Sequence, residues 1–253
     1  MMFNKTNNKI IFLFILCMSI TSLAQNKALE YYKQGNVYAK LKQYEKALEQ
    51  YNLSIEEDST FYKSHRNKGL ILSNIGKYPE SIISYDTAIS LNDTDYILFY
   101  NKGNILLKIQ NYQEALNSFN KSIRINPSYY GSYINKGFVL LTLNQQKEAV
   151  DAFNKAIELN PKCYEAYINK MCSLFRLGLY QEVIEAADKA ITLSTNRDSL
   201  YIVHTNKGVS LNKLRRYKEA IESAEIALKS KPDYELAIFV KKHALSSLHQ
   251  QDK

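Results

Sequence analysis

Several residue types are scarce in this chain, and each scarcity excludes a class of protein. The 253 residues include no tryptophan, only four prolines and only three cysteines. Cys163 and Cys172 are nine residues apart, and nine residues of helix span roughly 13 Å, which is beyond the reach of a disulfide. Cys17 lies in an apolar stretch near the amino terminus. We therefore expect no disulfide framework, and free, mostly buried thiols at Cys163 and Cys172.

Motifs that carry chemistry are also missing. The sequence contains no glycine-rich phosphate loop, no paired cysteines at metal-binding spacing and no nucleophile motif. Of the four histidines, His243 and His249 are six residues apart, not the three or four that would place them on one helix face. His65 and His204 stand at positions where aromatic residues recur, so we expect them in a partly buried packing role. We expect no catalysis, no cofactor and no metal site.

Glycine is scarce but regularly spaced. Five of the eight glycines share one position of a 34-residue period: Gly35, Gly69, Gly103, Gly137 and Gly208. Met171 takes the fifth place, and three inserted residues within 194–199 lengthen the last interval to 37. We expect a surface loop at this insertion, with a hinge as the alternative. A period of this length is typical of stacked two-helix repeats, none of which can bury its apolar face alone. Six repeats fit the spacing: 28–61, 62–95, 96–129, 130–163, 164–197 and 201–234.

The side chains within each repeat predict two packed helices. With each repeat numbered from 1 at its first residue, positions 4, 8 and 11 share one face of a first helix, and positions 20, 24 and 27 share one face of a second. Small residues at positions 8, 20 and 27 allow close approach, and aromatic residues at positions 4 and 24 fill the adjoining space. In repeat 5, Met171 replaces the glycine and Ala187 replaces the aromatic residue. We expect the larger side chain to be offset by the smaller one opposite.

This pattern resembles the tetratricopeptide repeat over nearly all of residues 28–234. Repeat 4 carries almost the full pattern, with YINKG at 133–137, EAVDAF at 148–153 and Asn160-Pro161 after the second helix. The resemblance implies an all-α fold, a right-handed α-solenoid of six helix-turn-helix repeats within residues 25–253. Residues 235–249 are predicted to form a final helix with a polar outer face, the cap that the end of a solenoid needs.

The first 24 residues have the order of a secretory signal peptide. Lys5 and Lys9 precede an apolar run at 10–20, and Ser22 and Ala24 place small residues three and one before a cut after Ala24. The run is shorter than the roughly 18–20 apolar residues that a membrane-spanning helix needs. We expect cleavage after Ala24 and export to the periplasm or the exterior of a bacterial cell, with an uncleaved anchor as the alternative. No second run of this kind follows, so no membrane span is expected after cleavage.

The first helices are expected to line the concave side of such an array. Position 6 is lysine in repeat 1 and asparagine in the next five repeats: Asn67, Asn101, Asn135, Asn169 and Asn206. Asn36 and Asn104 stand at position 9. An asparagine side chain offers a donor and an acceptor, which match one peptide unit of an extended backbone. The ladder resembles the asparagine arrays of superhelical repeat domains in sugar transferases. Two interpretations stay open: the ladder holds a peptide, or it steadies the contacts between helices.

Aromatic, apolar and basic residues are predicted to surround the ladder. Tyr32 and Tyr100 stand at position 5. The middle of the array is expected to expose apolar side chains, and one edge is expected to be basic. The apolar residues are Leu107, Phe138, Leu141 and Phe175, and the basic residues are Lys40, Lys108, Arg176 and Lys213. An exposed apolar patch usually marks a binding site. The predicted ligand is an extended segment with apolar side chains and some acidic character, unless the cap helix itself closes the groove.

The sequence therefore predicts a non-catalytic protein-interaction module that binds a peptide or partner segment in its groove. The alternative is a structural subunit of a cell-envelope assembly, bound through the convex face or the ends of the array. Self-association is a third possibility. The formal net charge is only modestly positive, at +8, or +6 without Lys5 and Lys9. This modest charge and the predicted export both argue against nucleic acid as a partner.

Overall fold

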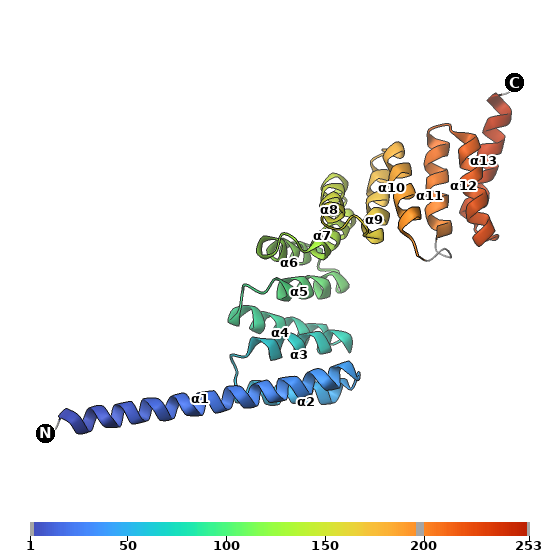
Figure 1. The fold of residues 1–253 in the computed structure, drawn as a ribbon. Helices are drawn as coiled ribbons and strands as arrows, with labels where there is room; N and C mark the ends of the chain where they lie inside the picture. Colours follow the sequence, from blue (N-terminus) through green and yellow to red (C-terminus); the bar gives the residue numbers. More distant parts are fainter. Residues whose placement is uncertain (1–2, 196–199, 252–253) are drawn as a thin grey trace. The chain divides into compact units, whose positions relative to one another are not determined.

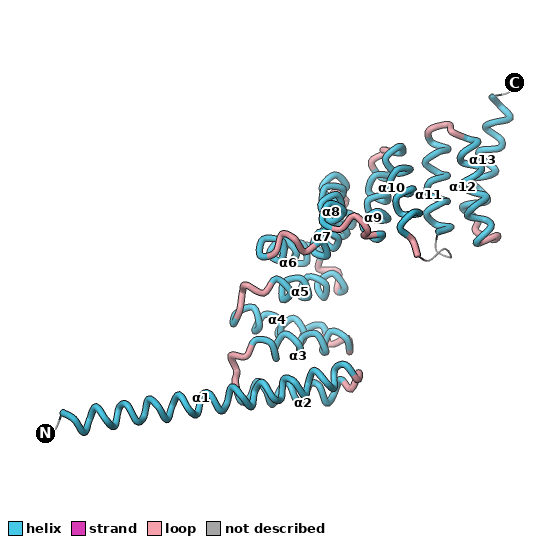
Figure 2. The backbone as a smooth tube through the Cα atoms, in the orientation of Figure 1, coloured by secondary structure: helices cyan, strands magenta, loops and turns pink. Residues whose placement is uncertain are grey.

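The computed structural model describes residues 3–195 and 200–251, and for residues 3–21 it describes the backbone only. Within these ranges every regular element is an α-helix, and the helices belong to two compact units, residues 1–125 and 126–253. In each unit, successive helices form pairs joined by short turns (Figures 1 and 2). The fold is thus the all-α solenoid of helix pairs that the sequence predicts.

The first unit contains three helix pairs. Its helices are α1 (Phe3–Lys40), α2 (Tyr44–Glu57), α3 (Tyr62–Asn74), α4 (Tyr78–Leu91), α5 (Tyr96–Lys108) and α6 (Tyr112–Ile125). Helix α1 packs against α2, α3 against α4 and α5 against α6, while α2 contacts α3 and α4 contacts α5. Each pair therefore covers the apolar face of the next pair, as a stacked repeat requires.

The amino-terminal helix α1 continues without a break from the predicted signal segment into repeat 1. The side chains of residues 3–21, on which the signal-peptide prediction depends, lie outside the described part of the chain. Among the residues that are described, no helix is both long enough and apolar enough to cross a membrane.

The second unit contains three further pairs and a final helix. Its helices are α7 (Tyr130–Thr142), α8 (Gln146–Leu159), α9 (Tyr164–Arg176), α10 (Tyr180–Leu193), α11 (Leu200–Lys213), α12 (Tyr217–Ser230) and α13 (Glu235–Gln251). Helix α13 packs against both α11 and α12. The insertion that the sequence places before Leu200 falls largely on residues 196–199, which lie outside the described residues.

Contact between positions 8 and 24 closes the helix pairs of repeats 1–5. In repeat 4, a Cβ atom added to Gly137 would lie 2.6 Å from the ring of Phe153, so only glycine fits beside this ring. In repeat 5, the arrangement is reversed: Met171 is 1% exposed and packs in one cluster with Ala187. The predicted offset of a large side chain by a small one is confirmed.

Repeat 6 closes in a third way. It has a glycine at position 8, Gly208, but Ala224 stands where repeats 1–4 have an aromatic ring. Val240 of α13 takes the space instead, since a Cβ on Gly208 would lie 2.9 Å from its Cγ1 atom. The cap helix therefore supplies part of the core of the last repeat.

The turn between the two helices of each repeat uses the same backbone conformation. The residue at position 15 has a positive φ, between 58° and 80°, in all six repeats: Lys42, Gly76, Gln110, Asn144, Gly178 and Arg215. The next amide donates back into the helix, as Gln43 N does to Tyr38 O, which is the bond of a Schellman motif. Only two of the six residues are glycine, so the other four hold a conformation that L-residues disfavour.

The two cysteines after residue 25 are free, and the prediction that they are mostly buried is wrong for one of them. Cys163 is half-buried, whereas Cys172 is exposed. Cys172 stands at position 9, on the outward side of α9, while the neighbouring Met171 points into the core. A shift of one residue on a helix turns a side chain by about 100°, which separates the two environments.

Candidate functional site

In the first unit, Asn67 is hydrogen-bonded within the array. Its Nδ2 donates to Asn36 Oδ1 at 2.7 Å, and the same oxygen accepts the hydroxyl of Tyr51 at 2.8 Å. Asn67 Oδ1 accepts Arg66 Nε at 3.2 Å, and Arg66 Nη1 forms an ion pair with Asp95 at 3.1 Å. These bonds connect α1, α2 and α3 with the residue that caps α5. At this rung of the ladder the asparagine steadies the contact between repeats.

The next rung differs because Leu70 replaces asparagine at position 9. Tyr85 is 0% exposed, and its hydroxyl has no hydrogen-bond partner among the described residues. Burial raises the pKa of Tyr85 well above its ordinary value, and the nearby side chains of Asn101 and Arg66 oppose this rise. The half-buried amide of Asn101 lies near this hydroxyl without forming a hydrogen bond, and it has no other such bond within the described ranges.

The other asparagines fall into two groups. Asn169 and Asn206 are half-buried, and each accepts a serine hydroxyl through its backbone carbonyl, from Ser173 and Ser210. Their side-chain amides make no hydrogen bond within the part of the chain that the structure describes. Asn104 and Asn135, also half-buried, already take part in interactions. Asn101, Asn169 and Asn206 are thus the rungs whose side-chain amides make no hydrogen bond to another described residue.

The tyrosines at position 5 are half-buried and rest on other rings. Tyr32 meets Phe61 edge-to-face, with ring centroids 5.3 Å apart. The ring of Tyr100 lies 6.1 Å from that of Phe119. Aromatic contacts of this kind help to hold the two tyrosine rings in place.

The expected apolar patch is smaller than the sequence predicts. Phe138 and Phe175 are 42% and 37% exposed, and Leu107 is half-buried. Leu141 is only 8% exposed, so the prediction that it offers apolar surface is wrong. Arg176 reaches back from the end of α9 and donates to the carbonyl of Leu141 at 3.2 Å, which helps to cover the end of α7.

The predicted basic residues have different environments. Lys40 and Lys213 are exposed. Lys108 lies over the ring of Tyr78, 5.9 Å from its centroid, and Arg176 makes the carbonyl contact described above. A cation over a ring keeps its charge available to an anionic partner.

A pocket that sequence reasoning missed lies between α11 and α13. It has a volume of about 220 Å³ and is lined by Val209, Asn212, Lys213, Leu236, Phe239, Val240 and His243. Of these residues, only Lys213 is among those that the repeat pattern singles out. The sequence signal for this pocket is Phe239. If the repeat numbering is continued into the cap helix from residue 235, Phe239 stands at position 5. Within the described residues, no three His, Cys, Asp or Glu side chains form a group that could hold a metal ion.

Comparison with known families identifies the repeat. Sequence profiles of the tetratricopeptide repeat match more than half of the chain, at residues 28–61, 62–95, 96–129, 131–163 and 202–234. The chain therefore belongs to the tetratricopeptide repeat family. Repeat 5, in which Met171 replaces glycine, lies wholly outside the matched ranges. No curated protein matches the chain.

Several solved structures share the fold. YrrB, a tetratricopeptide protein with an unusual peptide-binding site, superposes with a TM-score of 0.68 at 24% identity, over 76% of this chain and 97% of that one. PilF from Pseudomonas aeruginosa has a TM-score of 0.71 at 14% identity, over 87% and 98%. A tetratricopeptide protein from Parabacteroides merdae has a TM-score of 0.65 at 18% identity, over 90% and 93%. The tetratricopeptide fold points to protein–protein interaction.

Proposed function

We propose that this chain binds extended peptide segments of a protein partner along the outward face of its first helices, in each of its two units. The observation that carries the proposal is the set of amides at position 6 that have no internal hydrogen bond among the described residues, those of Asn101, Asn169 and Asn206. Each could bond one peptide unit of a ligand, and each such bond is worth about 0.5–1.5 kcal/mol. The peptide-binding site of YrrB, which shares the fold, supports the same kind of ligand by analogy.

Two exposed aromatic residues on first helices of the second unit supply an apolar component. Phe138 stands at position 9 of repeat 4, on α7, and Phe175 stands at position 12 of repeat 5, on α9. Aromatic residues are enriched in protein interfaces. In this proposal the amides hold the ligand backbone and the rings contact its apolar side chains. The chain itself acts as a non-catalytic binding protein.

The test is site-specific photo-crosslinking in cells, followed by mass spectrometry. The crosslinking residue replaces Phe138, on a first helix, or Ile226, on a second helix with a nearly equal exposure of 44%. We expect one discrete partner from Phe138 and none from Ile226. The same partner captured from Ile226 alone would refute binding to the first helices.

A matched pair of triple variants then tests the amides. Replacing Asn101, Asn169 and Asn206 by alanine should weaken binding of the captured partner at least tenfold. The control replaces three asparagines on second helices by alanine: Asn52, Asn120 and Asn154. Equal affinity of the two triple variants would show that the ladder does not bind the ligand.

One observation favours the alternative of a scaffold subunit bound through the end of the array. Val37 is 56% exposed at position 10 of the first repeat, where the later repeats bury Ile71 and Ile105 against a preceding helix. Leu41, one helical turn further, is 61% exposed. Substituting Val37 and Leu41 by serine should abolish an end-bound assembly and leave peptide capture unchanged.

We also propose that the protein is exported and cleaved after Ala24. The basis is the sequence order of Lys5 and Lys9, the apolar run at 10–20 and the small residues before Ala24. Amino-terminal sequencing of the protein purified from its native cell should begin at Gln25. A chain that still starts at residue 1 in the membrane fraction would support the anchor instead.

A further inference from the structure

The cap helix α13 does more than cover the end of the second unit, because it forms one wall of the 220 Å³ pocket against α11. We propose that this pocket binds one large apolar side chain of an acidic peptide segment. The inference rests on the proposed function and deepens it: the pocket would fix the register of a ligand that the asparagines hold by its backbone alone.

The wall of the pocket is apolar and uncovered. Phe239 is 64% exposed and Leu236 is 40% exposed, while Ala237, Val240 and Ala244 of the same helix are buried. The ring of Phe239 lies 6.2 Å from that of His243, which in turn lies 6.4 Å from Tyr217 on α12. This row of rings offers an apolar surface, and burying an apolar side chain against it would favour binding.

A polar atom in the pocket lacks a partner. Asn212 Nδ2 donates to the carbonyl of Val240 at 3.0 Å, which fixes the orientation of this amide. Its Oδ1 atom is buried and has no hydrogen-bond partner among the described residues. A buried acceptor that stays unpaired destabilises the fold, so a small turn of the Asn212 amide that brought Oδ1 to the backbone N–H of a bound peptide would be favoured.

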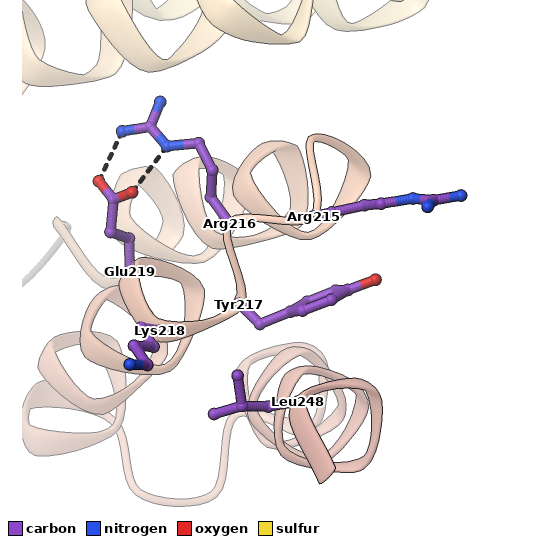
Figure 3. A pocket seen from close by; sticks show the side chains of 6 residues that line it. All are labelled: Arg215, Arg216, Tyr217, Lys218, Glu219 and Leu248. Carbon is purple, nitrogen blue, oxygen red and sulfur yellow. Dashed lines mark hydrogen bonds and ion pairs between the residues drawn. The ribbon is translucent and has the colours of Figure 1, made fainter. Parts of the chain in front are cut away.

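The charge around the pocket selects an acidic segment. A second pocket of about 270 Å³ adjoins through Tyr217 and is lined by Arg215, Arg216, Lys218, Glu219 and Leu248. Figure 3 shows Arg215 and Tyr217 pointing to the same side, with Leu248 of α13 below Tyr217. Glu219, the acid among the lining residues, forms an ion pair with Arg216.

The exposed cations therefore make the surface around the two pockets positively charged. Lys213, Arg215 and Lys218 are exposed, and none of them forms an ion pair with another residue that lines either of the two pockets. A second copy of this chain, with a net charge of +8, is the less suitable occupant because it would bring like charge to this surface. An acidic peptide is attracted by it.

The test uses three fluorescein-labelled ten-residue peptides and anisotropy with the purified full chain. The first peptide is acidic with a central phenylalanine, the second has alanine at the centre, and the third has lysine in place of the acids. We expect the first to bind at least tenfold more tightly than the other two. Absence of saturable binding by the first peptide would overturn the proposal.

Two variants and two matched controls locate the binding. F239S and K213E should each weaken binding of the first peptide at least tenfold. I83S removes an equally exposed apolar side chain from α4, and K121E makes the same charge change on α6; both should bind within twofold of the original chain. Unchanged binding by F239S and K213E would overturn the pocket. Circular dichroism and a urea melt verify that each variant is folded.

The alanine triple variant of Asn101, Asn169 and Asn206 separates this inference from the proposed function. If the triple variant loses the peptide and F239S keeps it, the ladder binds and the pocket proposal fails. If F239S loses the peptide and the triple variant keeps it, the pocket stands and the ladder fails. Loss in both supports both proposals.

Discussion

The hydroxyl of Tyr51 donates to the side-chain oxygen of Asn36 across a distance of 2.8 Å. This bond joins the second helix of repeat 1 to the first, and Asn67 of repeat 2 donates to the same oxygen. One repeat later the tyrosine is retained as Tyr85, but its partner is replaced by Leu70. The same side chain is therefore satisfied in one repeat and unsatisfied in the next.

Removing the two hydroxyls should have opposite effects on stability. Tyr51→Phe should lower the free energy of unfolding by about 1 kcal/mol, because it removes a hydrogen bond. Tyr85→Phe should leave it unchanged or raise it by about 1 kcal/mol, because it removes a buried hydroxyl without a partner among the described residues. Urea denaturation of both variants measures the difference. An equal loss in both would show that Tyr85 is hydrogen-bonded in solution.

The pair at positions 8 and 24 should be exchangeable as a unit. Gly137→Met alone should clash with Phe153, and Phe153→Ala alone should leave a cavity that costs about 3–5 kcal/mol. The double variant reproduces the Met171 and Ala187 arrangement of repeat 5 and should recover about 1–3 kcal/mol relative to the sum of the singles. A double-mutant cycle in urea measures this coupling, and strict additivity would contradict it.

Substitutions at position 15 of the turns should change the free energy of unfolding by different amounts. Gly178→Ala should lower the free energy of unfolding by about 1–2 kcal/mol, because its φ of 75° disfavours a Cβ even though no atom lies within 4 Å of one. Gln110→Gly should raise it by roughly 0.5–1 kcal/mol, after allowance for the greater freedom of glycine in the unfolded chain. Asn144→Gly serves as the control and should gain less, because asparagine tolerates this conformation. Thermal and urea melts rank the three.

Stability should decrease in mild acid partly through His65. Burial lowers the pKa of His65 below its ordinary value, opposed by a hydrogen bond with the carbonyl of Ser59 and reinforced by Lys68. The neutral ring is favoured in the fold, so its contribution is complete above the ordinary pKa of about 6.5 and is lost as the pH falls through the lower folded pKa. His65→Tyr introduces tyrosine, which is the residue that three other repeats have at position 4.

The measurement for His65 is the urea midpoint at pH 7.5 and pH 5.5. The decrease between these two pH values should be smaller in His65→Tyr than in the original chain. His249→Tyr, at an exposed site on α13, is the control and should leave the decrease unchanged. Identical decreases in all three proteins would remove His65 as a cause.

The architecture could be predicted because its signals are local and repeated. A glycine every 34 residues, opposed by a ring at position 24, is enough to identify the two helices and their contact from the residues alone. The turns were not predictable in the same way. Lys42 and Gln110 hold a left-handed backbone although neither is glycine, because the Schellman bonds of the preceding helix impose the conformation.

The candidate site was predicted less completely because its properties depend on neighbours in other repeats. Position 6 singles out the asparagines, but it treats Asn67 and Asn101 alike. Only the residue at position 9 of the preceding repeat, Asn36 or Leu70, decides which amide has a partner. Leu141 is also buried, and its backbone carbonyl accepts a hydrogen bond from Arg176 in the next repeat, a contact that the repeat position alone does not reveal.

Val240 of α13 makes the last repeat dependent on the cap helix that follows it. Repeats 1–5 carry the side chain that fills the space between their two helices, whereas repeat 6 borrows it from the helix that follows. An additional repeat could therefore be inserted between earlier repeats, but not between repeat 6 and its cap, unless Ala224 were also replaced by a ring. Repeats can therefore be gained or lost within the array, whereas repeat 6 and helix α13 must be kept together.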